Sequence, residues 1–126
     1  MTNSLSAFSL LEAREDCELC LVGGMYRRRT AAFVGPMAED TLRALGIDTA
    51  FVGANGILDG DVSTSNMDEG RIQQLTFSKV DTRYLIADSS RIGRRYICPP
   101  AGAGVPLYND AQITLSNKDE AILRYD

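Results

Sequence analysis

A polar run near residue 90 contains the side chains best suited to bind an anion. It reads Asp88-Ser89-Ser90-Arg91, and the planar guanidinium of an arginine can hold two oxygens of a phosphate at once. Asn3 and Ser4 stand just before an apolar helical pattern, where free backbone N–H groups and the helix dipole favour an anion. These two segments indicate a site for a charged ligand.

Each of these segments also permits a purely structural role. Asn3 and Ser4 can cap the helix that follows them, and Arg91 can form a salt bridge with a neighbouring carboxylate. A basic triplet at residues 27–29 can steer an anion toward a site, although a solvated loop is the interpretation that we favour there. The residue types alone leave both roles open.

Two glycine-containing loops and one glutamate complete the set of candidates. Gly23-Gly24 either lets a ligand approach the backbone closely or forms a tight turn after a strand. In Gly53-Ala54-Asn55-Gly56, the asparagine can exchange hydrogen bonds with hydroxyl groups, or Asn-Gly can form a type I′ turn. Glu69 either reaches a ligand from the start of its helix or closes a reciprocal cap with Asn66.

The sequence contains no histidine. A Ser-His-Asp triad, a Cys-His pair and a zinc site with histidine ligands are therefore all excluded within this chain. We expect no catalytic residue, no metal and no cofactor.

Three cysteines, Cys17, Cys20 and Cys98, suggest free thiols in a reducing compartment. Cys17 and Cys20 form a C-x-x-C pattern, but a thioredoxin-type pair begins a helix, whereas Cys20 falls in an apolar segment that reads as a strand. We therefore expect these cysteines to be buried or half-buried packing residues.

Length and charge narrow the class of protein further. The chain has 126 residues, enough for one domain with a real core. Its net charge is −4 and its pI about 4.8, which disfavours direct contact with a DNA backbone. No apolar run approaches the roughly 20 residues that span a bilayer, and no secretory signal is visible. We expect a cytoplasmic protein without membrane contact.

Helices and strands alternate along the chain by hydrophobic periodicity. Helices are expected at 4–15, 36–45, 66–80 and from 118 to 125, and strands at 18–22, 31–34, 48–53, 83–87 and 111–115, with 25–30 as a loop. Such alternation predicts an α/β fold with a mostly parallel sheet and helices on both faces. Ligands then bind beyond the carboxyl ends of the strands, in the loops after residues 22, 53, 87 and 115.

The order and spacing of these loop motifs resemble the C-terminal effector-sensing domain of DeoR-type bacterial transcriptional regulators over nearly the whole chain. The motifs that carry the resemblance are Thr2-Asn3-Ser4, Gly23-Gly24, Val34-Gly35-Pro36, Asp48-x-Ala50-Phe51-Val52-Gly53-Ala54-x-Gly56-Ile57, Glu69 and Asp88-Ser89-Ser90-Arg91-x-Gly93. In the family the turn after Asp88 usually ends in lysine, and Arg91 stands there in this chain.

The resemblance implies a three-layer α/β/α, Rossmann-like architecture, similar to ribose-phosphate isomerase, glucosamine-phosphate deaminase and CoA-transferase-like folds. It also implies a phosphorylated sugar or sugar alcohol as effector, a repressor of carbohydrate catabolism, and a homo-oligomer. The residues implied as ligand contacts are Asn3, Ser4, Gly23, Gly24, Gly53, Ala54, Asn55, Glu69, Asp88, Ser90 and Arg91.

Several parts of such a regulator are not found in this sequence. The winged helix-turn-helix that would bind DNA is absent, as are the first βα segment with its phosphate-cradling loop and the far C-terminal strand. We therefore expect the chain to be part of a regulator that contacts DNA only through another domain.

Two other functions remain open at this stage. The first is a sugar-phosphate isomerase-like enzyme of the same fold, with Glu69 as the general base. The loop after the central strand disfavours it, because no acidic residue follows Gly53 until Asp59. The second is an interaction module whose open sheet edge pairs with another copy.

Overall fold

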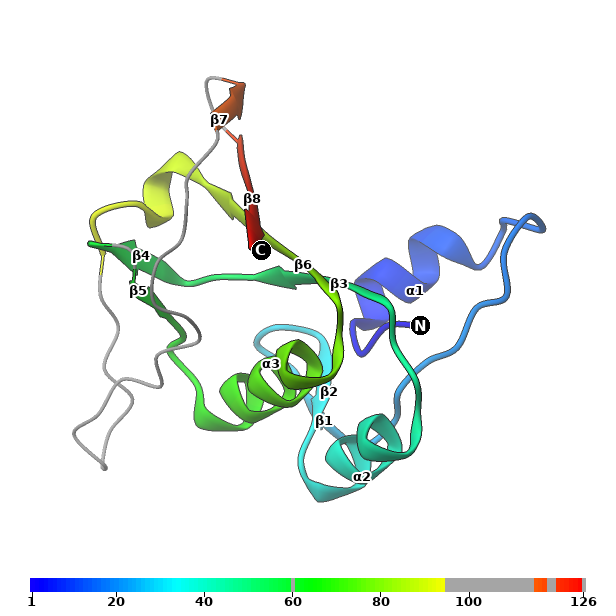
Figure 1. Cartoon of the computed structure of the whole chain (residues 1–126). Coiled ribbons are helices and arrows are strands. Elements are labelled where there is room, and N and C mark those ends of the chain that lie inside the picture. The colour runs from blue at the N-terminus through cyan, green and yellow to red at the C-terminus, as the bar shows by residue number, and fades with distance from the viewer. Residues whose placement is uncertain (60, 95–114, 118–119, 126) are drawn as a thin grey trace. The chain divides into compact units, whose positions relative to one another are not determined.

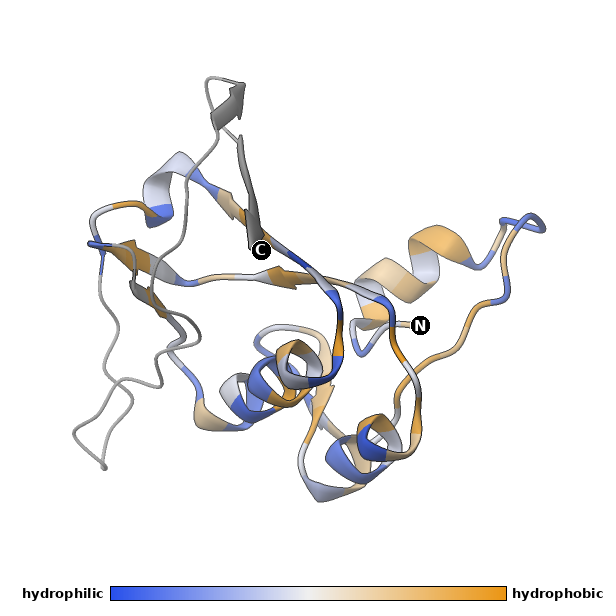
Figure 2. Cartoon of the chain, viewed as in Figure 1, coloured by the Kyte–Doolittle hydropathy of each residue, from blue (hydrophilic) through white to orange (hydrophobic). Residues whose placement is uncertain are grey.

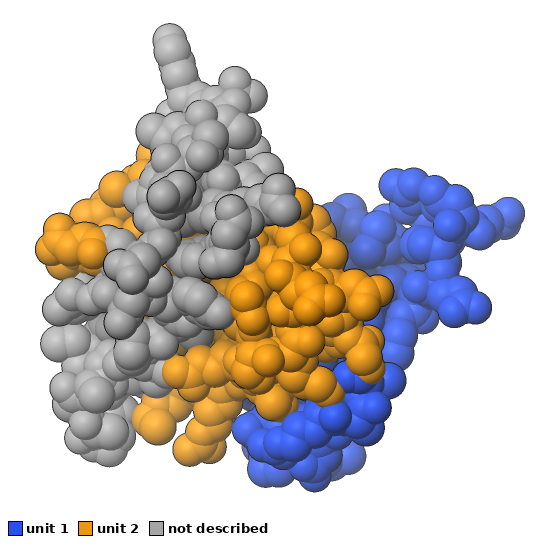
Figure 3. Space-filling model, in the orientation of Figure 1, with its two compact units in different colours: residues 1–45 blue, residues 46–126 orange. Residues whose placement is uncertain are grey.

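The computed structural model describes residues 1–59, 61–94, 115–117 and 120–125 (Figure 1). The chain divides into two compact units, residues 1–45 and 46–126 (Figure 3). Both contain helices and strands, so the fold is a mixed α/β fold.

The first unit begins with a short helix, α1 (Leu5–Leu11), whose N-cap is Ser4. The predicted helix continued to Glu15, but Glu12 is the C-cap and the chain leaves the helix there. The helix carries many apolar residues (Figure 2), yet none is buried and Leu10 is 82% exposed. The apolar side chains of α1 are therefore at most half-buried within the described part of the chain.

A hairpin and a second helix complete this unit. Strands β1 (Met25–Arg27) and β2 (Ala32–Val34) pair antiparallel, so the expectation of a loop over 25–30 is wrong in its first half. The rings of Tyr26 and Phe33, which face each other across the pair, lie 5.3 Å apart. Helix α2 (Pro36–Ala44) follows, with proline in its first turn as predicted.

The segment before the hairpin contradicts two predictions. The expected strand at 18–22 is reduced to one parallel bridge between Thr2 and Leu21. Cys17 and Cys20 are both exposed free thiols, so the prediction of buried or half-buried packing is wrong for them. Within the segment Val22 is buried at 1% exposure, whereas Glu18 and Cys20 face solvent. Cys98 lies outside the described residues.

The second unit is built on a parallel strand pair with a helix between them in sequence. Strands β3 (Thr49–Gly53) and β6 (Thr82–Asp88) pair in parallel, with Val52 opposite Leu85. Helix α3 (Met67–Lys79) connects them. Between β3 and α3, strands β4 (Gly56–Leu58) and β5 (Asp61–Ser63) form a small antiparallel hairpin. The bounds of β3, α3 and β6 follow the predicted positions closely, whereas the β4–β5 hairpin was not predicted.

The C-terminal strands overturn one prediction and change the character of the sheet. Residues 120–125 were expected in a helix, but they form strand β8 (Glu120–Tyr125). It pairs antiparallel with β6, and β7 (Leu115–Asn117) pairs antiparallel with β8. Among the described strands only β3–β6 is a parallel pair. The expected strand at 111–115 lies outside the described residues except for Leu115.

One face of β3 and β6 forms the core of the second unit with α3. Alternation along β3 buries Ala50 and Val52 and exposes Phe51, as the two-residue period of a strand requires. Phe77 of α3 is 1% exposed. The core cluster consists of Ala50, Val52, Ile57, Val62, Phe77, Val80, Leu85 and Ala87.

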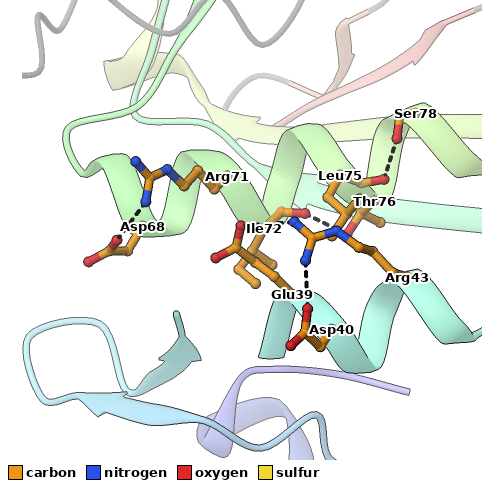
Figure 4. A network of polar contacts seen from close by, with 9 residues as sticks. All are labelled: Glu39, Asp40, Arg43, Asp68, Arg71, Ile72, Leu75, Thr76 and Ser78. Carbon is orange, nitrogen blue, oxygen red and sulfur yellow. Dashed lines mark hydrogen bonds and ion pairs between the residues drawn. The ribbon is translucent and has the colours of Figure 1, made fainter. Parts of the chain in front are cut away.

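Both helices carry polar contacts between residues three or four positions apart (Figure 4). Arg43 of α2 lies 2.7 Å from the exposed Asp40 and 3.6 Å from Glu39, whose side chain is only 13% exposed. On α3, Arg71 lies 3.9 Å from Asp68, and both side chains are exposed. Exposed pairs of this kind add only a few tenths of a kcal/mol, about 0.3–0.5 each. The pairs Arg43–Asp40 and Arg71–Asp68 therefore mark the solvent side of each helix.

Candidate functional site

The candidate residues divide between the two units. Asn3, Ser4 and the Gly23-Gly24 pair belong to the first unit, and the other seven belong to the second. The candidate residues therefore form two separate groups, one in each unit.

In the first unit, the segment at residues 2–4 is held between two neighbouring pieces of chain. The N–H of Thr2 donates to the carbonyl of Cys20 at 2.9 Å, and the N–H of Val22 donates back to Thr2 at 2.8 Å. On the other side, Asn3 binds Phe33 of β2 through both its backbone carbonyl and its side-chain Nδ2, at 2.8 and 3.0 Å. The side chain of Asn3 therefore helps to attach residues 2–4 to strand β2.

Ser4 and the two glycines also show their structural roles. The Oγ of Ser4 accepts from the N–H of Ala7 at 3.2 Å, which confirms helix capping, while its O–H remains a donor. Gly24 has φ +154°, and a Cβ there would lie 2.6 Å from the carbonyl oxygen of Val34, so the tight turn requires glycine. Gly23 is exposed and a Cβ there meets nothing within 4 Å.

The basic triplet is only partly a loop. Arg27 belongs to β1 and is half-buried, whereas Arg28 and Arg29 are exposed in the turn of the hairpin. The two exposed arginines agree with the solvated role that the sequence favoured.

In the second unit, the parallel register brings two candidate segments to one edge of the sheet. Gly53 at the end of β3 stands opposite Ile86 of β6, and the N–H of Ala54 donates to the carbonyl of Ile86 at 3.3 Å. Because both strands run in the same direction, Ala54-Asn55 and Asp88-Ser89-Ser90-Arg91 leave the sheet at the same edge.

Asn55 organises the connection between β3 and α3. Its Oδ1 accepts from Oγ1 of Thr64 at 2.9 Å and from the N–H of Ser65 at 3.1 Å. The alternative of a type I′ turn at Asn55-Gly56 is wrong, because neither residue has a positive φ and Gly56 already begins β4. The hairpin turns instead at Asp59, whose φ is +52°. The Nδ2 of Asn55 donates to no acceptor within the described ranges.

The chain that follows β6 is held against strand β4 of the β4–β5 hairpin. The N–H of Gly93 donates to the carbonyl of Ile57 at 2.7 Å, and Ile57 and Ile92 form a parallel bridge. A Cβ at Gly56 would collide with the carbonyl of Arg94 and lie 3.0 Å from the Oγ of Ser63. Glycine at position 56 therefore allows the chain after β6 to lie against β4.

The polar run after β6 forms a compact turn that is held by hydrogen bonds and one ion pair. The carboxylate of Asp88 accepts from the N–H of Ser90 at 2.8 Å and from its hydroxyl, in a short 3-10 helix of residues 89–91. Those bonds, the hydroxyl first, lower the pKa of Asp88 below its ordinary value, and the charge of Arg91 adds a smaller effect. The Nε of Arg91 lies 3.7 Å from Asp88, so the predicted salt-bridge alternative is observed.

The start of α3 shows one half of the predicted reciprocal cap, the half in which the side chain of Asn66 is the acceptor. The Oδ1 of Asn66 accepts from the N–H of Glu69 at 3.0 Å, and Glu69 is half-buried in the first helical turn. One turn later, Gln73 donates from Nε2 to the carbonyl of Gly53 at 3.0 Å. Sequence reasoning missed Gln73. Its spacing of four residues from Glu69 puts both on one helix face, and that was the available signal.

Comparison with known proteins identifies the family. The model of the DeoR C terminal sensor domain matches residues 1–102. The chain belongs to this family. The match confirms the class that the loop motifs indicated, a sensor domain of a transcriptional regulator and not an enzyme.

Curated relatives of this sensor domain are repressors and regulators. The chain is 40% identical over 94 residues to the lactose phosphotransferase system repressor of Lactococcus lactis subsp. lactis, covering 75% of the chain and 37% of the relative. It is 42% identical over 82 residues to the HTH-type transcriptional regulator GlpR of Haloferax volcanii, covering 64% and 32%. The sensor domain thus spans about a third of the length of these relatives.

The described part of the chain shows neither a membrane-spanning helix nor a metal cluster. No helix in it is long and apolar enough to cross a membrane. Within the same ranges, no group of three or more cysteine, aspartate or glutamate side chains is placed to hold a metal ion.

Proposed function

We propose that this sensor domain binds a phosphorylated sugar or sugar alcohol at the carboxyl ends of β3 and β6. The observation that carries the proposal is the parallel register, which makes Gly53-Ala54-Asn55 and Asp88-Ser89-Ser90-Arg91 leave the sheet at one edge. In open α/β sheets, ligands bind beyond the carboxyl ends of the strands.

Arg91 is the residue we assign to the phosphate. Its contact with Asp88 is long, at 3.7 Å, and involves partly exposed side chains, so it contributes little and can be exchanged for a stronger partner. Asp88 owes its lowered pKa first to Ser90 and only secondarily to Arg91. The guanidinium can therefore turn to a phosphate without leaving the Asp88 carboxylate unsupported.

Asn55, Glu69 and the loop formed by the exposed Gly53 and the half-buried Ala54 are assigned to the sugar. Asn55 uses its Oδ1 to hold the loop, which orients its Nδ2 as a preset donor for a hydroxyl oxygen. In the first unit, Ser4 and Gly23 are the residues best suited to contact a ligand. The O–H of Ser4 can still donate, and Gly23 is exposed with open space around it. Asn3 and Gly24 would act indirectly, because they hold the backbone next to Ser4 and Gly23 in place.

For the complete sensor domain we propose the three-layer α/β/α arrangement with a mostly parallel sheet. The face of β3 and β6 away from α3 supports it, because Phe51 is 64% exposed and Ile86 45% exposed there. The rings of Phe51 and Tyr84 stack at 4.8 Å on this face. Parallel strands in α/β proteins are covered on both faces, so an additional layer accounts for these apolar side chains.

For the whole regulator we propose a cytoplasmic, homo-oligomeric repressor of carbohydrate catabolism that contacts DNA through a separate helix-turn-helix domain. The names of the relatives, among them a lactose phosphotransferase system repressor, support a sugar-derived effector. Binding of the effector to the sensor domain would relieve repression.

The test is a thermal-shift and calorimetric screen of the chain with phosphorylated sugars, their free sugars and inorganic phosphate. We expect at least one phosphorylated sugar to raise the melting temperature, because binding to the folded state alone stabilises it. The matching free sugar should have little effect, since it cannot engage Arg91. Stabilisation by free sugars alone would contradict the proposal.

A further inference from the structure

Gln73 lies where the ligand loop leaves the sheet. It belongs to α3, and its side chain is half-buried. Its Nε2 donates to the carbonyl of Gly53 at 3.0 Å. A backbone carbonyl accepts hydrogen bonds and cannot donate them, so the amide nitrogen must face it. This contact therefore fixes the direction of the other end of the carboxamide, Oε1.

The Oε1 of Gln73 is buried and receives no hydrogen bond from the described residues. The backbone donors of the nearby loop are already used, since Ala54 donates to Ile86 and Asn55 donates to Ser63. A buried acceptor without a donor is costly and rare in folded proteins. A donor from outside the protein would remove that cost.

The residue that anchors this carboxamide lies at the surface. Gly53, to which the carboxamide is anchored, is exposed. The carboxamide therefore lies just below the surface at the end of β3. The terminal torsion of glutamine is soft, so the carboxamide can adjust to a group that approaches from the loop while Nε2 still faces the carbonyl of Gly53.

We propose that Gln73 is a further specificity-determining residue of the sensor domain, whose Oε1 accepts a hydrogen bond from a hydroxyl group of the effector. This inference rests on the proposed function and deepens it. Arg91 holds the phosphate, whereas Gln73 distinguishes a polyhydroxylated ligand from a phosphate that carries no hydroxyl-bearing carbon.

The experiment compares Gln73→Met with the matched control Gln74→Met in the full chain. Methionine keeps the length of the side chain and removes both polar ends, and Gln74 is the exposed neighbour on the same helix. Calorimetry uses inorganic phosphate, a panel of hexose and polyol phosphates, and monodeoxy analogues of the sugar phosphate that the wild-type chain binds most tightly.

We expect Gln73→Met to weaken binding of that sugar phosphate about 3- to 10-fold, the worth of one neutral hydrogen bond. Binding of inorganic phosphate should not change, and Gln74→Met should behave as wild type. One monodeoxy analogue should bind wild type as weakly as the parent ligand binds Gln73→Met. Gln73→Asn, a milder change that also withdraws Oε1, serves as the second variant and should show the same selective loss.

Three results would overturn the inference in distinguishable ways. Unchanged binding of the sugar phosphate by Gln73→Met removes the role of Gln73 but leaves the proposed function intact. Equal losses for inorganic phosphate and sugar phosphate show that Gln73 only anchors Gly53. If the wild-type chain binds no member of the panel, the proposed function fails and this inference fails with it.

Discussion

Two arginine–aspartate pairs of the second unit have nearly the same geometry but different surroundings. Arg91 lies 3.7 Å from Asp88 and Arg71 lies 3.9 Å from Asp68, each three residues along the chain. Arg71 stands on the solvent side of a helix. Arg91 stands at the carboxyl end of β6, where its neighbour Asp88 is already stabilised by Ser90. Our assignment of Arg91 to the ligand therefore rests on its position in the fold and not on its pairing with Asp88.

This difference leads to a prediction for Arg91→Gln with Arg71→Gln as its control. Removing the Arg91 charge should weaken binding of a phosphorylated sugar by about 1.5–3 kcal/mol, the range for hydrogen bonds to charged groups. Neither change should alter the free energy of unfolding by more than about 0.5 kcal/mol, because both pairs are exposed. Calorimetric titration and urea unfolding measure the two quantities. Equal affinity losses in both variants would contradict the assignment of Arg91.

The cysteines show how a residue-scale inference depends on the element around it. The apolar run near Cys20 predicted a strand and therefore burial. The chain there makes only one bridge, from Leu21 to Thr2, and both Cys17 and Cys20 are exposed. Local hydrophobicity cannot reveal whether a strand will find partners, because that depends on distant segments.

At the scale of elements, the β4–β5 hairpin and the chain after β6 depend on one close approach. Gly93 and Ile92 bind Ile57, and Gly56 leaves room for the carbonyl of Arg94. The Asp88–Arg91 turn is therefore held between β6 and the hairpin. Its geometry is a consequence of this contact and not of its own residues alone.

We expect Gly56→Ala to destabilise the chain by about 1–3 kcal/mol, the usual cost of inserting a methyl group where none fits. The control is Gly46→Ala, because a Cβ at that position meets nothing within 4 Å. Urea unfolding should show a lower midpoint for Gly56→Ala with an unchanged slope. A midpoint equal to that of wild type would mean that the chain after β6 does not depend on this contact.

At the scale of the whole molecule, the described sheet leaves an edge and an apolar face open. The strand order is β3-β6-β8-β7, so β3 is an edge strand among those described. Phe51 lies on it and is 64% exposed. Edge strands and uncovered apolar faces promote association with further chain segments or with other copies.

We therefore expect the isolated chain to self-associate as its concentration rises, and Phe51→Lys to reduce this association. Leu10→Lys is the control, because Leu10 is more exposed than Phe51, at 82%, but lies on α1 and not on the sheet. Light scattering over a range of concentrations measures the effect. A wild-type chain that stays monomeric throughout would contradict it.

Local sequence patterns determined the elements whose stability is local. Pro36 marked the start of α2, Asn66 marked the start of α3, and alternating residues marked β3. The same patterns placed the candidate loops at the ends of β3 and β6. These predictions succeeded because caps and periodicity act over a few residues, and a single sequence contains all the information they need.

Only the tertiary structure decided what depends on distant partners. Local periodicity predicted a helix for residues 120–125, whereas pairing with β6 makes them a strand. The role of Asn55 was decided by Thr64 and Ser65, and that of Gln73 by Gly53. Such hydrogen bonds join residues that belong to different elements, so neither propensity nor periodicity predicts them. They form only when the fold brings those elements together.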